Sequence, residues 1–413
     1  MILMISIHFG DLLNTLSILL VLFLLLTSFI NLIVSFVFRN FPNLILTKNE
    51  FKRNDYISRF DDELYNLKED WFKINKTEWK EFKKEYQETE LNIYKYDPFC
   101  EYGHQPKKGK FINYSQHGFR YSENQGPWPP NKNFFNIFFF GGSTTLGVGP
   151  DWTTIPSHFQ KIAIKNNKKV RVYNFGRGAY FSTLEFLLFI KLLRERKKID
   201  MAIFIDGIND CFFKNGLPAT HGIYREAINN MNHRNSLQSR NIHRSKTNFH
   251  FLKLFLQDLP LFKLIDILMD RLAGDKNIIN KESDKLTTNE IDNIIENYIF
   301  NVNSINAITS SNNLKAYFIW QPTPNYQYKS VNWHNKLSKW KDQYYIGHQN
   351  AKDVYKTFSN IKKPKNFIWL ADMQRNEKKG LYLDSTHYNN YFSQKIASEI
   401  FNKIKESIRT KIK

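Results

Sequence analysis

The sequence reads Phe134-Phe135-Asn136-Ile137-Phe138-Phe139-Phe140-Gly141-Gly142-Ser143-Thr144-Thr145 from residue 134 to residue 145. Residues 134–140 are nearly all Phe or Ile, which predicts a buried strand, and the two glycines end it. Ser143 then lies on the first turn after the strand, at the edge of a sheet. Neighbouring glycines allow backbone N–H groups to approach whatever the serine attacks. Because Gly-Gly-Ser is also an ordinary turn, the interpretation depends on three later segments.

Each of these segments follows a strand-like run or precedes a helix. They read Asn174-Phe175-Gly176-Arg177-Gly178-Ala179 after Val170–Tyr173, Gly207-Ile208-Asn209-Asp210 after Met201–Asp206, and Asp384-Ser385-Thr386-His387 near the C-terminus. In an open α/β sheet such loops gather at the carboxyl ends of the strands, where ligands bind. We therefore expect the four segments to meet at one edge of a sheet.

The residue types in these segments suit attack on an ester. A serine hydroxyl such as that of Ser143 is a weak nucleophile until a base removes its proton, and His387 can act as that base near neutral pH. Asp384 can accept a hydrogen bond from the other ring nitrogen and fix the tautomer. The N–H of Ser143, an N–H near Gly178 and the side chain of Asn209 are candidate donors to an oxyanion.

Together the four segments resemble the blocks of the SGNH hydrolases, also called GDSL hydrolases. That superfamily has a serine after the first strand, a glycine after the second, an Asn in Gly-x-Asn-Asp after the third, and Asp-x-x-His near the end. The resemblance covers residues 134 to about 410 and implies an α/β, flavodoxin-like three-layer fold with a parallel sheet. It implies Ser143 as nucleophile, His387 as base and Asp384 as its support, with Ser143, Gly178 and Asn209 forming the oxyanion hole.

Two positions depart from the family pattern. The Asp of Gly-Asp-Ser is Gly142 here, although that Asp transfers no proton in the family. Counted from Asn174, the usual glycine of the second block falls at Ala179, and Gly178 comes one position early. Either residue can present a backbone N–H.

Structural interpretations compete with the catalytic one. Ser143 could be a turn residue, Asn209 and Asp210 could cap a helix, and His387 could be a surface histidine. Their family order at strand ends favours catalysis. The P-loop lysine, Gly-x-Ser-x-Gly, His-Glu-x-x-His and cysteines at zinc spacing are all missing, so we expect neither a cofactor nor a metal.

The N-terminal region predicts a membrane anchor. Residues 12–38 contain no charged residue, and as a helix this stretch would be about 40 Å long, against the roughly 30 Å of a hydrocarbon core. A cleaved signal peptide is the alternative, but residues 1–11 carry no Lys or Arg and no small-x-small site follows. We expect a single-pass membrane protein with a helix that stays attached.

Two observations predict opposite orientations of this helix in the membrane. Basic residues follow it, which by the positive-inside rule would leave the large domain in the cytoplasm. Anchored proteins that resemble this one are mostly envelope enzymes whose catalytic domain faces outward. We therefore expect an extracytoplasmic catalytic domain.

Composition indicates the kind of partner. The net charge is +20, which could attract anionic lipids or an acidic polysaccharide, or could reflect a Lys-, Asn- and Ile-rich proteome. The expected partners are an acyl ester of a carbohydrate or a lipid and the membrane itself, through residues 12–38. No nucleic-acid motif accompanies the basic residues, so we expect no nucleic acid. Cys100 and Cys211 could form one disulfide bond, but sequence cannot show that they meet.

The chain is expected to divide into an N-terminal tail (1–11), a transmembrane helix (12–38), a juxtamembrane linker with an N-terminal cap (39–132) and an SGNH-like domain (133–410) with an insertion (212–287). Strands are predicted at 134–140, 169–173, 200–206, 314–320 and 366–371. Helices are predicted at 154–166, 182–197, 288–309, 335–359 and 390–409, with Thr288 as the N-cap of the third.

The predicted function is that of a membrane-anchored serine esterase which cleaves acyl esters, including acetyl esters, through a Ser143-His387-Asp384 triad and an acyl-enzyme. One alternative is an O-acyltransferase that acts on envelope polysaccharide with the same residues. Another is a non-catalytic binding or assembly protein on the same fold.

Overall fold

The computed structural model describes residues 2–40, 76–92, 94–195, 197–212, 259–261, 264–265, 285–328, 350–378, 380–384 and 386–408. The chain divides into two compact units, Met1–Ser58 with Asn230–Lys281, and Arg59–Asn229 with Glu282–Lys413. The second unit contains all four segments singled out in the sequence, and it holds the sheet.

A five-stranded parallel sheet forms the centre of the second unit. Its strands are β3 (Phe135–Gly141), β4 (Val170–Asn174), β5 (Met201–Asp206), β6 (Lys315–Trp320) and β7 (Phe367–Trp369). They lie in the order β4-β3-β5-β6-β7. Counted within this sheet the order is 2-1-3-4-5, that of flavodoxin-like folds, so the α/β fold class is confirmed.

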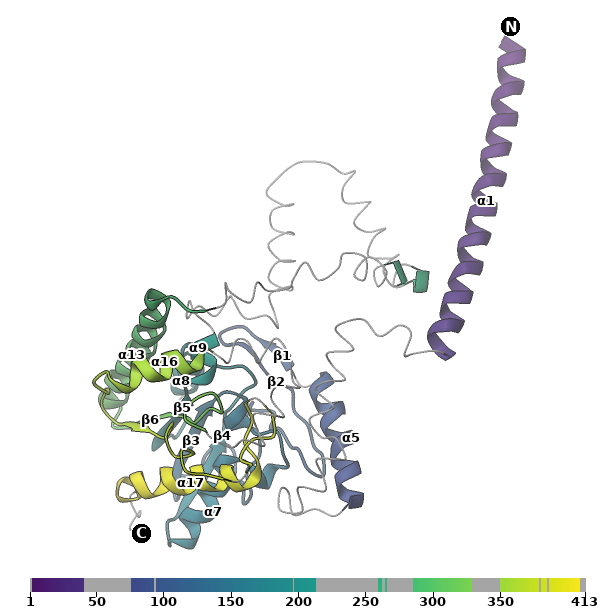
Figure 1. Cartoon of the computed structure of the whole chain (residues 1–413). Helices are drawn as coiled ribbons and strands as arrows, with labels where there is room; N and C mark the ends of the chain where they lie inside the picture. The colour runs from purple at the N-terminus through teal and green to yellow at the C-terminus, as the bar shows by residue number, and fades with distance from the viewer. Residues whose placement is uncertain are drawn as a thin grey trace. The chain divides into compact units, whose positions relative to one another are not determined.

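Alternate residues of the strands face two helical layers (Figure 1). Phe138 and Phe140 of β3 pack in one core with helices α8 (Ser182–Arg194), α13 (Thr288–Ser311) and α16 (Ala351–Ser359). Ile137 and Phe139 pack in the other with α7 (Ile155–Lys165) and α17 (Asn390–Ile404). A strand buried on both faces needs apolar residues throughout, which explains why residues 134–140 do not alternate with polar ones.

The predicted elements agree with the observed bounds to within a few residues, with two corrections. The N-cap of α13 is Thr287, not Thr288, because Thr287 and Glu290 form a reciprocal capping box. Helix α1 (Ile2–Asn40) begins well before residue 12, so residues 2–11, predicted as a tail, are helical. Residues 335–349 and most of the insertion 212–287 lie outside the described residues.

An N-terminal layer precedes the sheet within the same unit. Helix α5 (Lys76–Asn92) packs through Trp79 and Phe82 against Phe111 of the following loop. Strands β1 (Tyr94–Asp97) and β2 (Glu101–His104) form an antiparallel hairpin. The short helices α6 (Ser143–Leu146), η2 (Asp151–Thr153), α9 (Ile208–Phe212) and η4 (Lys405–Ser407) complete the described elements.

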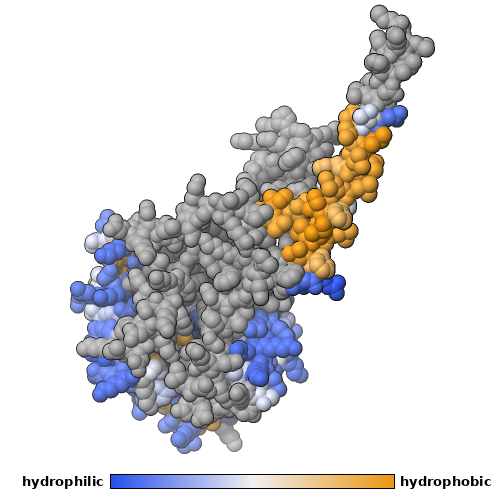
Figure 2. All heavy atoms as spheres, turned by 45° about the vertical axis from the view of Figure 1, so that its right-hand side comes forward, coloured by the Kyte–Doolittle hydropathy of each residue, from blue (hydrophilic) through white to orange (hydrophobic). Residues whose placement is uncertain are grey.

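Helix α1 is long and apolar enough to cross a membrane. The segment Asn14–Val37 has a mean hydropathy of 2.7, and its Leu, Ile and Phe side chains are exposed, as Figure 2 shows. A signal sequence would have the same properties. Within the first unit, the Asn31 side chain accepts a hydrogen bond of 2.9 Å from the Leu261 N–H.

Candidate active site

Ser143 begins helix α6 directly after β3. Gly142 is the N-cap of this helix, and its carbonyl accepts the N–H groups of Thr145 and Leu146 at 3.1 and 3.0 Å. The first N–H groups of a helix have no partner within it, so the N–H of Ser143 is available to a substrate. Ser143 is half-buried, and its hydroxyl therefore lies at a surface rather than in the core.

His387 lies beside Ser143. Its Nε2 is 2.8 Å from Ser143 Oγ, although 244 positions separate the two residues. Its Nδ1 is 2.6 Å from Asp384 Oδ2. Asp384 Oδ1 also accepts the N–H groups of Thr386 and His387 at 2.8 and 2.7 Å, so the carboxylate is held by its own turn. An Nδ1–H donated to Asp384 leaves Nε2 as the acceptor for the serine proton.

Gln321, which was not among the residues predicted from the sequence, links the segment of Ser143 to the segment of His387. It follows β6 and is buried, and its Oε1 accepts Thr144 Oγ1 at 2.6 Å and the Tyr388 hydroxyl at 3.1 Å. Thr144 and Tyr388 are the neighbours of Ser143 and His387 along the chain. The only sequence signal for Gln321 was a polar residue at the carboxyl end of the fourth strand.

Asn209 lies beside the serine turn. Its Nδ2 donates to the Tyr180 carbonyl at 2.7 Å, which leaves one of its two amide hydrogens for another acceptor. A Cβ added to Gly142 would lie 2.3 Å from this Nδ2. An aspartate at position 142 would therefore collide with Asn209, which gives a physical reason for the missing Asp.

Packing accounts for the position of the glycine in the second segment, at residue 178 rather than 179. A Cβ on Gly178 would lie 2.3 Å from the Tyr94 hydroxyl, so glycine is required here by the packing of the β1–β2 hairpin. Ala179 instead takes the left-handed backbone conformation, with φ of 57°, which usually favours glycine. Close packing therefore requires glycine at position 178, whereas the left-handed backbone conformation falls on Ala179.

The hairpin also fixes the peptide between Gly178 and Ala179. The Tyr102 hydroxyl donates to the Gly178 carbonyl. Because the C=O and N–H of a trans peptide point in opposite directions, the Ala179 N–H points away from Tyr102. The Arg177 guanidinium, also buried, donates to the Tyr102 carbonyl and to the Tyr180 hydroxyl, so hairpin and loop are tied together.

Three carboxyl groups are buried next to the Gly207–Asp210 turn. Asp210 accepts the N–H groups of Ser182 and Gly207, each at 3.2 Å, and so holds the turn that carries Asn209. Burial, with the charges of Asp206 and Asp210 nearby, raises the pKa of Glu185 well above its ordinary value. Burial likewise raises the pKa of Asp206 and of Asp210.

The two cysteines are free and buried. Burial raises the pKa of the Cys100 thiol to about 12, and that of Cys211 is also raised by burial. Neither thiol is therefore an activated nucleophile. Within the described ranges, no three His, Cys, Asp or Glu side chains come together as metal ligands.

No protein-family model matches this sequence, and no curated protein is similar to it. Solved structures do match. One is a lipase/acylhydrolase from Enterococcus faecalis, with 13% identity and a TM-score of 0.33 over 67% of this chain and 99% of that one. Another is a lipolytic protein of the G-D-S-L family from Desulfitobacterium hafniense, with 12% identity and a TM-score of 0.29 over 65% and 99%.

The strand order and the four segments at the carboxyl ends of the strands are features of this chain itself. The chain has an α/β fold with a parallel sheet in the flavodoxin-like strand order. The segments of Ser143, Asn209 and His387 meet at one edge of the sheet. The glycine block reaches the same edge with Ala179 in the left-handed conformation.

Proposed function

We propose that this protein is a serine esterase in which Ser143 is the nucleophile, His387 the general base and Asp384 the residue that orients the histidine. The observation that carries the proposal is the continuous chain of contacts from Ser143 Oγ through both nitrogens of His387 to Asp384, at 2.8 and 2.6 Å. A scaffold protein would have no need to align these three groups.

In the proposed reaction, Ser143 Oγ attacks the acyl carbon while His387 Nε2 takes its proton. The tetrahedral intermediate then expels the alcohol, to which His387 returns the proton, and an acyl-enzyme remains. Water enters, His387 removes a proton from it, and attack on the acyl carbon releases the acid and restores the serine. Asp384 stabilises the imidazolium that forms at each step and does not itself become protonated.

We assign the oxyanion donors to the N–H of Ser143, the N–H of the Gly178–Ala179 loop and the Asn209 amide. The N–H of Ala179 is preferred to that of Gly178, because Tyr102 holds the peptide with this N–H turned away from the hairpin. Preorganised donors of this kind stabilise the charge that develops in the transition state without having to reorient.

We also propose that helix α1 is retained as a membrane anchor and that the SGNH unit lies outside the cytoplasm. Support for the anchor comes from its apolar length and exposed side chains. The outward orientation depends on the resemblance to anchored envelope enzymes, since the flanking basic residues favour the opposite side.

Labelling with a fluorophosphonate, which reacts with activated serines, tests the proposal on the full-length protein in detergent. We expect labelling of the wild type and of Ser359→Ala, an exposed serine of α16, and none of Ser143→Ala. Equal labelling of Ser143→Ala, or a wild-type protein that stays unlabelled although folded by circular dichroism, contradicts the proposal. With ester substrates, a product that forms only when a sugar acceptor is added identifies acyl transfer instead.

A further inference from the structure

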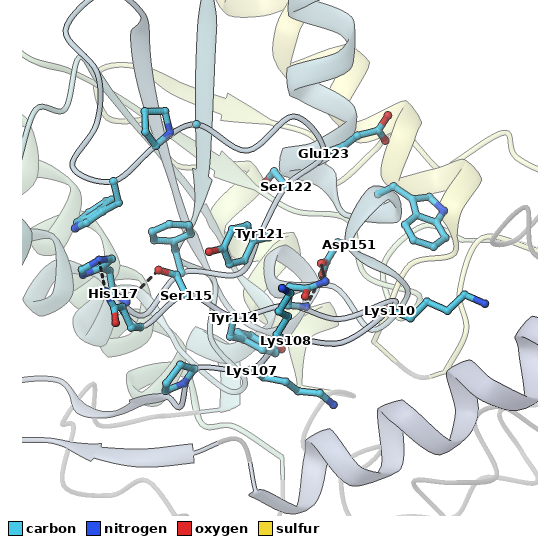
Figure 3. Close-up of a pocket in the computed structure, with 18 residues that line it drawn as sticks. Lys107, Lys108, Lys110, Tyr114, Ser115, His117, Tyr121, Ser122, Glu123 and Asp151 are labelled. Atoms are coloured by element: carbon cyan, nitrogen blue, oxygen red, sulfur yellow. Dashed lines mark hydrogen bonds between the residues drawn. The ribbon is translucent and has the colours of Figure 1, made fainter.

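A cleft of about 1230 Å³ lies in the second unit, apart from Ser143 and His387. Its lining comes from residues 106–128 and from Asp151 and Trp152 (Figure 3). One wall follows the edge of the sheet, because the Arg120 N–H pairs with the Asn174 carbonyl at the end of β4. The volume exceeds the roughly 300–1,000 Å³ of small-molecule pockets, so the cleft has room for an oligomer.

Aromatic rings are spaced along this cleft. The side chain of Tyr121 is 39% exposed and lies in Figure 3 between His117 and Asp151. The rings of His117 and Trp128 are stacked at 5.2 Å, and Trp152 is half-buried. A second hollow of about 370 Å³ shares His117 and Trp128 with the cleft, so this stack lies between the two hollows.

The charges in the cleft do not cancel. Its two carboxylates have cationic partners: Asp151 pairs with Arg120 at 2.8 Å, and Glu123 pairs with Lys161. Lys110 is likewise paired, with Glu81 at 2.8 Å. For Lys107 and Lys108 the described part of the chain shows no ion pair. Lys107 Nζ donates to the Glu85 carbonyl at 3.1 Å, and Lys108 is exposed. The carboxylates of Glu85 and Glu88 nevertheless lie near Lys107, so Lys108 is the lysine of the cleft for which the described residues show no counter-charge.

We propose that this cleft binds an acidic oligosaccharide. A sugar ring has an apolar face that packs on aromatic rings such as Tyr121 and Trp128 and, in uronic acids, a carboxylate that pairs with the exposed ammonium group of Lys108. A lipid acyl chain fits poorly, because lysines, serines and carboxylates interrupt the apolar lining.

The cleft is connected to the serine loop. Arg120 donates through Nε to Asp151 Oδ1 at 2.8 Å and through Nη1 to the Leu146 carbonyl, at the end of helix α6, at 3.1 Å. Its guanidinium thus joins a wall of the cleft to the helix that Ser143 begins. If the proposed esterase activity holds, the bound glycan is part of the ester substrate, and this last step alone depends on that activity.

Titration calorimetry of the full-length protein in detergent tests the binding, with a hexagalacturonate and a hyaluronan hexasaccharide as acidic probes and cellohexaose as the neutral one. We expect an acidic probe to bind at least 10-fold more tightly than cellohexaose. Tyr121→Ala and Lys108→Glu should each weaken binding about 10-fold. The matched controls Phe300→Ala on α13 and Lys165→Glu on α7, both exposed, should leave the affinity unchanged.

Failure of both acidic probes to bind, or binding that the cleft variants do not weaken, overturns the proposal. Equal binding of single-stranded dT6, lost in the same variants, assigns the cleft to nucleic acid and also overturns it. Fluorophosphonate labelling separates the two hypotheses. Binding that survives in Ser143→Ala while the wild type stays unlabelled contradicts the esterase alone, and labelling without glycan binding contradicts the cleft alone.

Discussion

Gly142 lies so close to the side chain of Asn209 that a Cβ at position 142 would displace the Asn209 amide. A Cβ on Gly142 would lie 2.3 Å from Asn209 Nδ2 and 3.0 Å from the Tyr180 carbonyl, to which the same amide donates. The Asn209 amide thus lies directly beside the turn that carries Ser143. This proximity makes Asn209 a candidate oxyanion donor.

Asn209→Ala should lower kcat for ester hydrolysis by roughly 10² to 10³, because one oxyanion donor is lost. Gly142→Asp should have an effect of the same order, since the new side chain displaces the amide. The double variant should be no slower than the worse single variant, because both changes remove one interaction. Steady-state kinetics of the three proteins check this, and fully additive losses would show that the two residues act separately.

Asp384→Asn should reduce kcat by about 10⁴ while the protein stays folded. The asparagine oxygen can still accept the N–H groups of Thr386 and His387, but its amide faces Nδ1 and stabilises the wrong tautomer of the histidine. Kinetics with an acetyl ester provide the measurement, and unchanged thermal unfolding provides the control. A rate within 10-fold of the wild type would exclude Asp384 from the triad.

Tyr102→Phe should lower kcat about 10-fold with little change in KM, because the peptide that presents the Ala179 N–H loses its hydrogen bond from the hairpin. The free energy of unfolding should fall by about 1 to 3 kcal/mol, since the buried Gly178 carbonyl is left without this donor. Tyr96→Phe is the matched control, because Tyr96 lies on the same hairpin and is 58% exposed. If both variants retain the wild-type kcat, the hairpin has only a structural role.

Glu185→Gln should stabilise the protein at pH 8 and change little at pH 4. The raised pKa means that Glu185 keeps its proton in the folded state at pH values above about 4.5, where the unfolded chain has lost it. The folded state then binds more protons, and the free energy of unfolding falls as the pH rises. Melting temperatures across this range test the sign, with Glu296→Gln, exposed on α13, as control. A lower melting temperature of Glu185→Gln at pH 8 would show that the carboxylate is favourably paired.

The full-length chain should fractionate with membranes, and a chain that begins at residue 59, the start of the second unit, should be soluble and still react with fluorophosphonate. Mass spectrometry of the purified protein distinguishes an anchor from a cleaved signal, because only an anchor leaves residues 2–40 attached. Protease added to intact cells then reports the side on which the second unit lies. Full-length protein in the soluble fraction would argue against the anchor.

Much of this fold could be predicted because its patterns are local. Seven nearly unbroken apolar residues at 134–140 indicate a strand buried on both faces, and turn residues mark where each strand ends. The N-cap of α13 was predicted one residue too late, at Thr288. The two threonines are adjacent, and only the hydrogen bonds between Thr287 and Glu290 distinguish them. Helix α1 begins at Ile2, whereas the uncharged stretch after Asp11 predicted a helix that begins at residue 12.

The sequence by itself determined the fold class, the residue types of the candidate site and their order along the chain, since these depend on periodicity and on spacing between neighbours. Only the tertiary structure decided that His387 reaches Ser143, that Gln321 joins their neighbours, and that Tyr102 holds the Gly178 peptide. It also brought Tyr121 and Lys108 into one cleft. Such contacts depend on the order of strands in the sheet and on how the hairpin packs against it, and neither is encoded in any short stretch of residues.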